Sequence, residues 1–415
     1  MNTSKKVVIL GSGFAGIYGA LSVYKNCGKD VSITIINRTN YFLFTPMLHE
    51  VATGGLGYHQ IVESIREIVY KKKINFIEAN ILSVDVANKK VLTDGVTVEY
   101  DVLVIATGAT TNFFGTPGAE ENSFVLKNLH DAIQIRDRII DIFEAASKET
   151  DTTKKRAMLS FVVVGGGATG VEIISEIAEL CSDTLKQYYK DKIGCDDITI
   201  SLINSAPELL SVFDPKIRAY AQKILEKNSI KILLNTKVSG VTKAGVTLGD
   251  GTLLASETVI WSAGVKPNEI VTTGGELPKD KGGRIVTSKT FQVVGLTDVF
   301  AVGDVSHFDE SSERGLPMLA QVAVMQGKLL GKNIHNFIHN KSLVNFVYKS
   351  KGEFVSLGHG EATGVAFGVH VYGRLAWFMW RTIYLFKFIS KSKRVRIVFD
   401  WTMQLFSNRD ITRAS

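Results

Sequence analysis

The chain begins with a short run of mostly apolar residues, a glycine-rich turn and a helical pattern. Residues 6–10 (KVVIL) are typical of a buried parallel strand, and residues 11–16 (GSGFAG) form the turn. The apolar spacing over residues 17–26 predicts a helix, and the run at residues 31–36 predicts a second strand. The order strand, helix, strand predicts a β-α-β unit of a parallel sheet.

The same order recurs in the middle of the chain. Residues 161–164 (FVVV) predict a strand, and residues 165–170 (GGGATG) predict a turn. A helical pattern then continues through Leu180 and is followed by a strand at residues 198–203 (ITISLI). The two units begin far apart in the chain, which indicates a duplicated domain rather than a short tandem repeat.

Further apolar strands end in small-residue turns in both halves. Such turns lie at residues 106–108, 263–264 and 303–304. Asp304 in the last turn can accept hydrogen bonds from a flavin ribityl chain or cap the following helix. The polar stretch at residues 147–156 predicts a solvated loop.

Two copies of the pattern GxGxxG carry the candidate chemistry. Glycine permits the tight turn and lets backbone N–H groups approach a pyrophosphate, which the following helix N-terminus also favours. One copy alone is weak evidence for a nucleotide site, because a glycine-rich turn need not bind a ligand. Two copies in the same strand-turn-helix context predict two dinucleotide sites, with glycines at Gly11, Gly13, Gly16, Gly165, Gly167 and Gly170.

Several longer segments resemble the type II NADH:quinone oxidoreductases among the pyridine-nucleotide flavoprotein reductases. They are residues 40–48 (NYFLFTPML), 51–55 (VATGG), 111–115 (TNFFG), 166–172 (GGATGVE) and 320–323 (AQVA). The resemblance implies an α/β fold of two Rossmann-like dinucleotide-binding domains, with the NADH domain inserted in the FAD domain, plus C-terminal amphipathic membrane-anchoring helices. The expected parts are FAD-binding at residues 1–118 and 267–340, NAD(P)H-binding at 119–266, and C-terminal at 341–415.

The resemblance implies that hydride passes from NADH to FAD and that electrons pass on to a membrane quinone, ubiquinone or menaquinone, without proton pumping. It places Glu172 near the nicotinamide–flavin junction and Gln321 near the quinone or the flavin edge. Glu172 can instead be a helix-start acid, and Gln321 an ordinary helix residue. The expected cofactor contacts are Gly11, Gly13, Phe14, Ala15, Gly16, Asn37, Arg38, Thr45, Ala106, Thr107, Gly108, Gly165, Gly167, Thr169, Gly170, Glu172, Asn204, Ala263, Gly264, Gly303, Asp304, Ala320 and Gln321.

Two departures from the family pattern keep alternatives open. The second glutamine of the quinone motif falls on Met325, and Gln326 one place later faces about 100° away on a helix. Asn37 and Asn204 stand where an acid that binds the ribose is usual. NADPH is therefore an alternative substrate to NADH. The alternatives are a soluble NAD(P)H-dependent flavoprotein reductase with a protein acceptor, and a catalytically altered nucleotide-binding sensor.

The three cysteines, Cys27, Cys181 and Cys195, match neither a CxxC pair nor a metal cluster. The sequence therefore predicts no redox disulfide and no metal, and no nucleic acid partner is expected. The N-terminus shows neither a secretory signal nor a transit peptide, so a protein on the cytoplasmic side is expected.

The positive charge of the chain is concentrated in its last 45 residues. They hold nine Lys/Arg against two Asp/Glu, which equals the whole net charge of +7, and three of the four tryptophans. Residues 373–389 are interrupted by Arg381 and Lys387, so they predict an in-plane helix with Trp377, Trp380 and Tyr384 on one side. We expect residues 373–406 to bind an anionic lipid surface on the cytoplasmic face of the inner (plasma) membrane. A dimerisation helix is the alternative, both roles can hold together, and a homodimer is expected.

Overall fold

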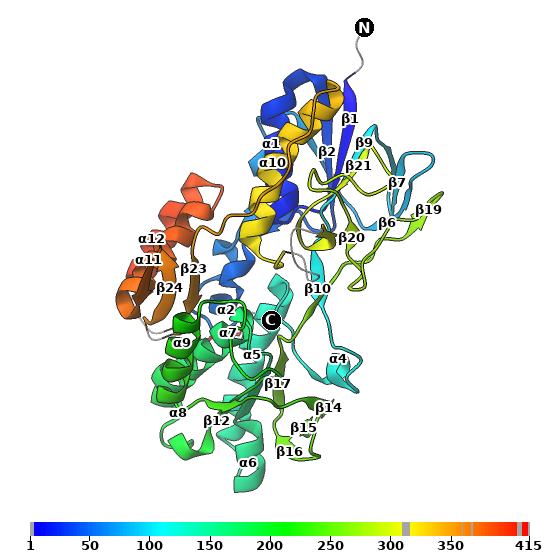
Figure 1. Ribbon diagram of the computed structural model, residues 1–415. Coiled ribbons are helices and arrows are strands. Elements are labelled where there is room, and N and C mark those ends of the chain that lie inside the picture. The colour runs from blue at the N-terminus through cyan, green and yellow to red at the C-terminus, as the bar shows by residue number, and fades with distance from the viewer. Residues whose placement is uncertain (1–3, 309–315, 359, 367, 405–408, 414–415) are drawn as a thin grey trace. The chain divides into compact units, whose positions relative to one another are not determined.

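The structure is a computed structural model that describes residues 4–308, 316–358, 360–366, 368–404 and 409–413 (Figure 1). The chain divides into two compact units, each built from separate segments. The first unit holds residues 1–43, 62–110 and 265–349, and the second holds residues 44–61, 111–264 and 350–415. The second unit thus combines the middle of the chain with its C-terminal part.

A five-stranded parallel sheet forms the core of the first unit. Its order is β21-β9-β1-β2-β5, with β1 (Lys5–Leu10) at the centre. Residues 7–10 of β1 are fully buried, as the unbroken apolar run predicts. The other strands are β2 (Val31–Asn37), β5 (Ile74–Glu78), β9 (Val102–Ile105) and β21 (Val299–Ala301).

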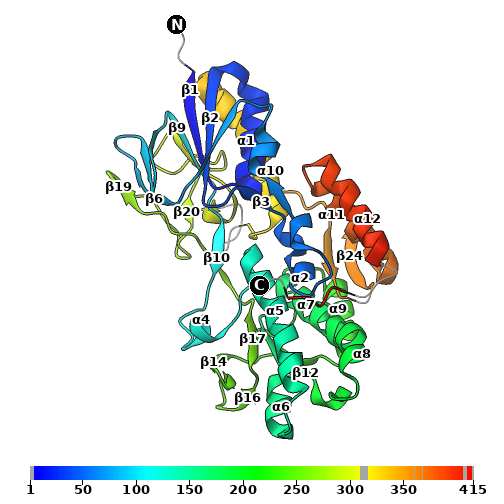
Figure 2. The same ribbon diagram turned by 180° about the vertical axis from the view of Figure 1, so that it is seen from behind.

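Two long helices pack against each other beside this sheet. They are α1 (Phe14–Cys27) and α10 (Ala320–Ile338), which lie side by side in both views (Figures 1 and 2). A Cβ on Gly327 of α10 would stand 2.7 Å from the Ala15 carbonyl oxygen, so glycine permits the close approach. The remaining elements of the unit are β3 (Tyr41–Leu43), β4 (Val62–Ser64), α3 (Ile65–Val69), β6 (Ile81–Asp85), β7 (Lys90–Thr93), β8 (Thr97–Glu99), β19 (Thr272–Thr273), β20 (Ile285–Val286) and β22 (Ser306–His307).

A four-stranded parallel sheet of order β13-β12-β11-β17 forms the core of the second unit. Its strands are β11 (Ser160–Val164), β12 (Thr199–Ile203), β13 (Lys231–Leu233) and β17 (Thr258–Trp261). The unit also contains α2 (Leu48–Val51), α4 (Ala119–Asn122), α5 (Leu129–Ala146), α6 (Thr152–Met158), α7 (Ala168–Glu179), α8 (Lys186–Tyr189), α9 (Pro215–Lys227), β14 (Val238–Thr242), β15 (Gly245–Leu248) and β16 (Leu253–Ala255). β10 (Ala109–Thr111) and β18 (Val265–Pro267) lie where the chain passes from one unit to the other.

The C-terminal part of the second unit is an antiparallel sheet followed by two helices. The strands are β23 (Glu353–Ser356), β24 (Ala362–Ala366) and β25 (Val369–Tyr372), and the helices are α11 (Gly373–Lys387) and α12 (Lys391–Gln404). The Arg381 guanidinium lies over the Trp377 ring at 4.0 Å and over the Trp401 ring at 4.7 Å, which joins the two helices.

The two predicted β-α-β units are confirmed, with strand ends within one residue of those expected. The solvated loop predicted at residues 147–156 is partly wrong, because α6 begins at Thr152 with Asp151 as its N-cap. The aromatic stripe on α11 also differs from the prediction. Trp380 is fully buried and packs on Tyr384 and His49, so it faces the protein rather than a lipid surface.

Among the residues that the structure describes, no helix is long and apolar enough to cross a membrane. Residues 405 and 406 of the predicted lipid-binding range lie outside the described residues. The four-part division into FAD-binding, NAD(P)H-binding and C-terminal domains remains a prediction.

Candidate functional site: two glycine turns and a buried acid cluster

The first glycine turn joins the carboxyl end of β1 to the amino end of α1. Gly11 has a φ of 96°, and a Cβ there would stand 2.4 Å from the Ala106 carbonyl oxygen. A Cβ on Gly16 would stand 2.0 Å from the Gly11 carbonyl oxygen, so packing alone requires glycine at both positions. Gly13, the N-cap of α1, differs because a Cβ there would meet no atom within 4 Å. This open space adjoins the amino end of a 14-residue helix, which favours an anion.

The second glycine turn repeats this division of roles between β11 and α7. A Cβ on Gly165 would stand 2.6 Å from the Ala263 backbone nitrogen, and one on Gly170 would stand 1.9 Å from the Gly165 carbonyl oxygen. Gly167, the N-cap of α7, again has open space in front of it. In each unit two glycines serve the packing of the turn, and the middle one leaves room for a ligand.

Asn37 and Asn204, at the ends of the second strands, fasten the loops around these turns. The Asn37 Oδ1 accepts from the Ser12 N–H at 3.2 Å, and the Asn204 Oδ1 accepts from the Gly166 N–H at 3.2 Å. The Asn204 Nδ2 donates to the Glu208 carbonyl at 2.8 Å. Both amides are therefore engaged by backbone partners, a role that the sequence analysis did not anticipate.

Five further residues that were predicted to contact a cofactor lie in or after the two β-α-β units. Phe14 opens α1 and meets Phe42 edge to face at 5.1 Å, and Ala15 beside it is buried. Arg38 is exposed after β2, and Thr169 is exposed in the first turn of α7. Thr45 is exposed and opens a 3-10 turn in the second unit.

The turn after β9 carries a hydroxyl with no assigned partner. The Thr107 Oγ1 is buried and accepts or donates no hydrogen bond among the described residues. The backbone here is held by Asn268, whose Nδ2 donates to the Thr107 carbonyl at 2.6 Å and whose N–H donates to the Gly108 carbonyl at 3.0 Å. The sequence analysis missed Asn268, which carried no motif signal. A buried orphan hydroxyl beside the first glycine turn suits a bound polar group.

The corresponding turn of the second unit follows β17. The Trp261 Nε1 donates to the Ala263 carbonyl at 2.9 Å, which holds the turn at the end of the strand. Gly264 has a φ of 71°, and a Cβ on it would stand 2.3 Å from the Phe114 ring. This turn therefore also requires glycine for packing.

The start of α10 brings the late Gly-Asp turn and the glutamines together in the first unit. The Gly303 N–H donates to the Gln326 Oε1 at 2.6 Å, and Gln326 is buried. Gln326 therefore supports the turn that carries Asp304. Gln321, in the first turn of α10 beside Ala320, is half-buried and donates to the Tyr348 hydroxyl at 3.4 Å.

Glu172 lies in the second turn of α7 and is almost enclosed, with 12% of its side chain exposed. Its Oε1 accepts from the Ser356 N–H at 3.4 Å, and its Oε2 lies 3.7 Å from the His49 Nδ1. Burial, with smaller repulsion from Glu176 and Glu50, raises the pKa of Glu172 to about 8. Burial lowers the pKa of His49 to about 3, which keeps its imidazole neutral. A carboxyl group with this pKa is mostly protonated at neutral pH.

Around Glu172 the second unit contains a buried group of charged residues that the sequence analysis missed. Glu50 is 2% exposed, and its Oε2 lies 3.4 Å from the Arg381 Nη2. Burial raises the pKa of Glu50 to about 7, although the Arg381 charge lowers it. Glu176 lies one turn beyond Glu172 on the same helix face. Two acids at helical spacing among isoleucines are a sequence signal that could have indicated buried acids on this helix.

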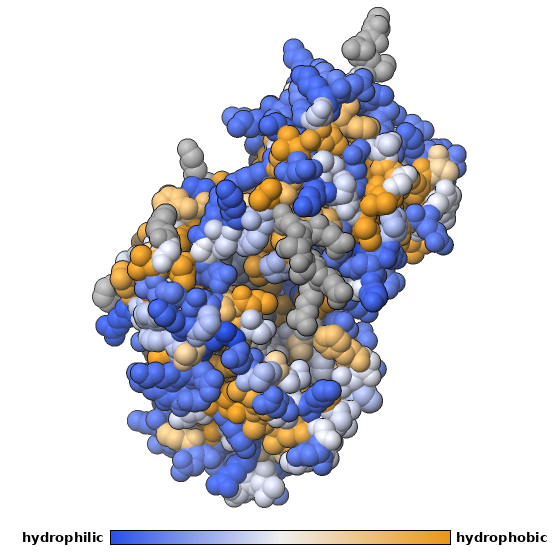
Figure 3. Space-filling view, in the orientation of Figure 1, coloured by the Kyte–Doolittle hydropathy of each residue, from blue (hydrophilic) through white to orange (hydrophobic). Residues whose placement is uncertain are grey.

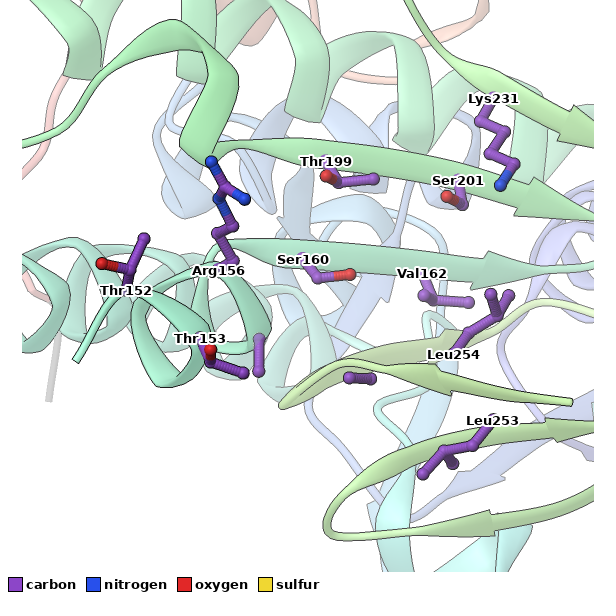
Figure 4. Close-up of a pocket in the computed structure, with 12 residues that line it drawn as sticks. Thr152, Thr153, Arg156, Ser160, Val162, Thr199, Ser201, Lys231, Leu253 and Leu254 are labelled. Atoms are coloured by element: carbon purple, nitrogen blue, oxygen red, sulfur yellow. The ribbon is translucent and has the colours of Figure 1, made fainter.

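The second unit also has an open hollow of about 390 Å³, which lies away from the second glycine turn (Figure 4). Ser160, Thr199 and Lys231 line it, and they are the first residues of β11, β12 and β13. It therefore sits at the amino ends of the parallel strands. Ligands of such sheets bind beyond the carboxyl ends, where the second glycine turn stands.

The described residues contain one group of three potential metal ligands, Asp30, His335 and His339. The His339 Nε2 lies 3.3 Å from the Asp30 Oδ2, which is an ion pair when the imidazole is protonated. The group lies at the distal ends of α1 and α10. The absence of a metal cofactor remains a prediction.

Two parallel α/β sheets, each with a glycine turn at the start of its helix, define a flavoprotein reductase of the pyridine-nucleotide type. The family model for the pyridine nucleotide-disulphide oxidoreductases matches residues 5–327. A second model, the NDH2 C-terminal domain, matches residues 351–410. The two matches together extend over most of the chain.

Relatives narrow the class. The type II NADH:quinone oxidoreductase of Staphylococcus haemolyticus is 32% identical over 386 residues, 91% of this chain and 94% of the relative, and that of Staphylococcus aureus is 31% identical over the same shares. This chain belongs to the type II NADH:quinone oxidoreductases, flavoenzymes that transfer electrons from NADH to quinone. The resemblance seen in the sequence is confirmed.

Solved structures share the fold. The NDH2 of Plasmodium falciparum in complex with NADH has a TM-score of 0.91 at 23% identity and covers 99% of this chain and 100% of that one. The sulfide:quinone oxidoreductase of Aquifex aeolicus has a TM-score of 0.73 at 20% identity, with 92% and 90% covered. At these identities the likeness concerns the fold alone.

Proposed function

We propose that FAD binds in the first unit, that NADH binds in the second, and that electrons pass to a membrane quinone without proton pumping. The observation that carries this proposal is the matched pair of turns, in which Gly13 and Gly167 alone among the motif glycines leave open space at a helix start. FAD, when bound, accepts hydride from NADH and passes electrons to quinone. The protein supplies binding, orientation and charge.

The first unit offers a fitting set of groups for the FAD pyrophosphate and ribityl chain. The amino end of α1 faces the open space at Gly13, and the orphan Thr107 hydroxyl lies in the adjacent turn. Asp304 follows Gly303, whose backbone Gln326 holds in place. The remaining contacts that we propose in this unit are Gly11, Phe14, Ala15, Gly16, Asn37, Arg38, Ala106, Gly108, Ala320 and Gln321. Thr45, in the second unit, is a further cofactor contact that we propose.

In the second unit the electrostatics around Asn204 favour NADH over NADPH. The Asn204 amide bonds to the Glu208 carbonyl, and the Glu208 carboxylate pairs with Arg218. The arginine near this loop is therefore paired, and no arginine stands immediately beside Asn204 in the sequence to attract a 2′-phosphate. We propose that Gly165, Gly167, Thr169, Gly170, Asn204, Ala263 and Gly264 contact the nucleotide.

Glu172 and Gln321 are the residues that we assign to the reaction. Quinone reduction by a hydride equivalent consumes one further proton, and Glu172 holds a proton at neutral pH. Glu172 therefore suits a role at the nicotinamide–flavin junction or in proton supply. Gln321 stands at the start of α10 and offers an amide to the quinone or the flavin edge.

The C-terminal helices present a surface that suits the interface of an anionic membrane. Leu375, Phe378 and Phe386 form an exposed stripe on α11, and Val395 and Phe399 are exposed on α12. Figure 3 shows hydrophobic side chains gathered over these helices, and exposed cations stand on them at Arg374, Lys387 and Arg396. We propose that residues 373–406 dock the protein on the cytoplasmic face of the membrane. The same stripe can be shared with a second copy in a homodimer.

Steady-state assays of the purified holoprotein test the function. NADH oxidation should depend on a short-chain quinone, and kcat/KM should be higher with NADH than with NADPH. Oxidation that proceeds only with a ferredoxin-type protein acceptor would instead identify a soluble reductase. A protein that binds NADH yet oxidises none with any acceptor would be a nucleotide sensor.

A further inference from the structure

Helix α7 carries three acids on one buried face. Glu172, Glu176 and Glu179 are spaced four and three residues apart, which places them on the same side of the helix. The side chains of Glu176 and Glu179 are 6% and 22% exposed. Like charges at this spacing repel each other, and burial strengthens the repulsion. The face therefore needs a cation.

The end of the chain supplies this cation. The Arg409 Nη2 lies 2.7 Å from the Glu176 Oε2 and 2.9 Å from the Glu179 Oε2. The Arg409 side chain is 15% exposed. A guanidinium has enough donors to serve two carboxylates at once, which a single ammonium does less well. Arg381, another arginine near this cluster, pairs with Glu50.

The same guanidinium also reaches the segment around α2. The Arg409 Nη1 donates to the Thr53 Oγ1 at 2.9 Å, and that hydroxyl donates to the His49 carbonyl at 3.0 Å. A Cβ on Gly54 would stand 2.4 Å from the Asp410 carbonyl oxygen, so the chain here makes room for the C-terminal segment. Arg409 thus bridges α7, which holds Glu172, and Thr53, whose hydroxyl bonds the His49 carbonyl in α2.

We call residues 409–413 the C-terminal latch. Asp410 stabilises it by accepting from the Thr412 N–H at 2.9 Å and hydroxyl at 2.6 Å. Arg413 pairs with Asp141 at 2.9 Å, but their side chains are 57% and 49% exposed. An exposed pair of this kind contributes little. Arg413 is therefore a matched control for Arg409. It has the same charge and lies in the same segment, and among the described residues its ion pair is with Asp141 of α5 rather than with α7 or α2.

We propose that Arg409 is a positioning residue for Glu172, and that the C-terminal latch thereby forms part of the electron-transfer site. This inference rests on the role proposed above for Glu172. Arg409 fixes the helix face that carries Glu172 against the segment that carries His49. It also balances the charge of Glu176 and Glu179, so that Glu172 keeps its contacts with Ser356 and His49.

The experiment compares Arg409→Ala with Arg413→Ala in the full-length holoprotein. Turnover with NADH and a short-chain quinone is measured with and without millimolar guanidinium chloride. We expect Arg409→Ala to lower kcat about tenfold, because sub-ångström misplacement of a reacting group is costly. Guanidinium should restore much of that loss in a saturable manner. Arg413→Ala and the unaltered protein should not respond to it.

Arg409→Lys is the second variant, and it serves if Arg409→Ala does not fold. Lysine keeps the charge but cannot bridge both acids and Thr53, so we expect kcat between those of the unaltered protein and Arg409→Ala. The proposal is overturned if Arg409→Ala matches Arg413→Ala, if guanidinium restores nothing in a folded Arg409→Ala, or if Arg409→Lys equals the unaltered protein. An unaltered protein that oxidises no NADH would refute the proposed function instead.

Discussion

Burial determines the chemistry of Glu172. A carboxylate without solvent and without its own cation prefers to be protonated, whereas Glu176 and Glu179 share the Arg409 guanidinium. One helix face therefore carries a protonated acid and two acids that are paired with an arginine. The protonated one stands nearest the second glycine turn, where the nucleotide is expected.

Replacing Glu172 by glutamine tests its role. Glutamine keeps the shape and can still accept from the Ser356 N–H, but it cannot release a proton. We predict that Glu172→Gln lowers kcat with quinone by about 10- to 100-fold, with a smaller change in the KM for NADH. Steady-state kinetics measure both quantities. A kcat within twofold of the unaltered protein would refute the assignment.

The raised pKa of Glu172 also makes stability depend on pH. Its pKa is about 8 in the folded protein against an ordinary value of 4.5, so the folded state binds more protons than the unfolded state between these values. The contribution of Glu172 to the free energy of unfolding is therefore fully present at low pH. It falls as the pH rises from about 4.5 to about 8. We predict a shallower fall of Tm between pH 6 and pH 9 for Glu172→Gln. Parallel Tm curves for the two proteins would contradict this.

At the scale of elements, the two glycine turns separate packing from ligand binding. Gly16 has the Gly11 carbonyl oxygen against it, whereas Gly13 faces open space. We predict that Gly16→Ala fails to fold or loses much of its stability. Gly13→Ala should fold with a near-normal apoprotein Tm but retain much less FAD, because a methyl group occupies the pyrophosphate approach. Flavin-to-protein absorbance ratios and apoprotein melting curves distinguish the two variants.

The apolar pattern predicted the strands and helices of both units because their periodicity is set by burial. It could not predict which side of α11 faces inward. Trp380 and Tyr384 share a helical stripe that is compatible with a membrane as well as with a core. The stripe faces inward because Trp380 packs on His49 and Tyr384. Likewise Asp151 caps α6 in a stretch too polar to show a helical period.

At the scale of the whole molecule, the glycine motifs could be located from the sequence, but the pairing of the α7 acids with Arg409 could not. Arg409, Glu176 and Thr53 lie in three distant segments, and their meeting depends on tertiary packing. Local patterns also do not show that the chain passes from the first unit to the second and back, with residues 44–61 in the second. A tail rich in cations predicts a surface partner without revealing that Arg381 and Arg409 pair with buried acids.

Exposed residues of the C-terminal helices give a prediction for membrane binding. We predict that Phe378→Ser combined with Phe386→Ser weakens co-sedimentation with anionic vesicles about tenfold, because two phenyl groups no longer enter the interface. Tyr70→Ser, at an exposed aromatic residue of the first unit, should leave binding unchanged. Equal vesicle binding by all three proteins would argue that the stripe serves dimerisation, which ultracentrifugation then tests.

The most direct test of the account is an anaerobic single-turnover experiment on the purified holoprotein. Addition of one equivalent of NADH should bleach the flavin absorbance, and addition of a short-chain quinone should then restore it. The account predicts both steps at rates at least as fast as steady-state turnover. A flavin that NADH leaves oxidised, or that quinone leaves reduced, would contradict it.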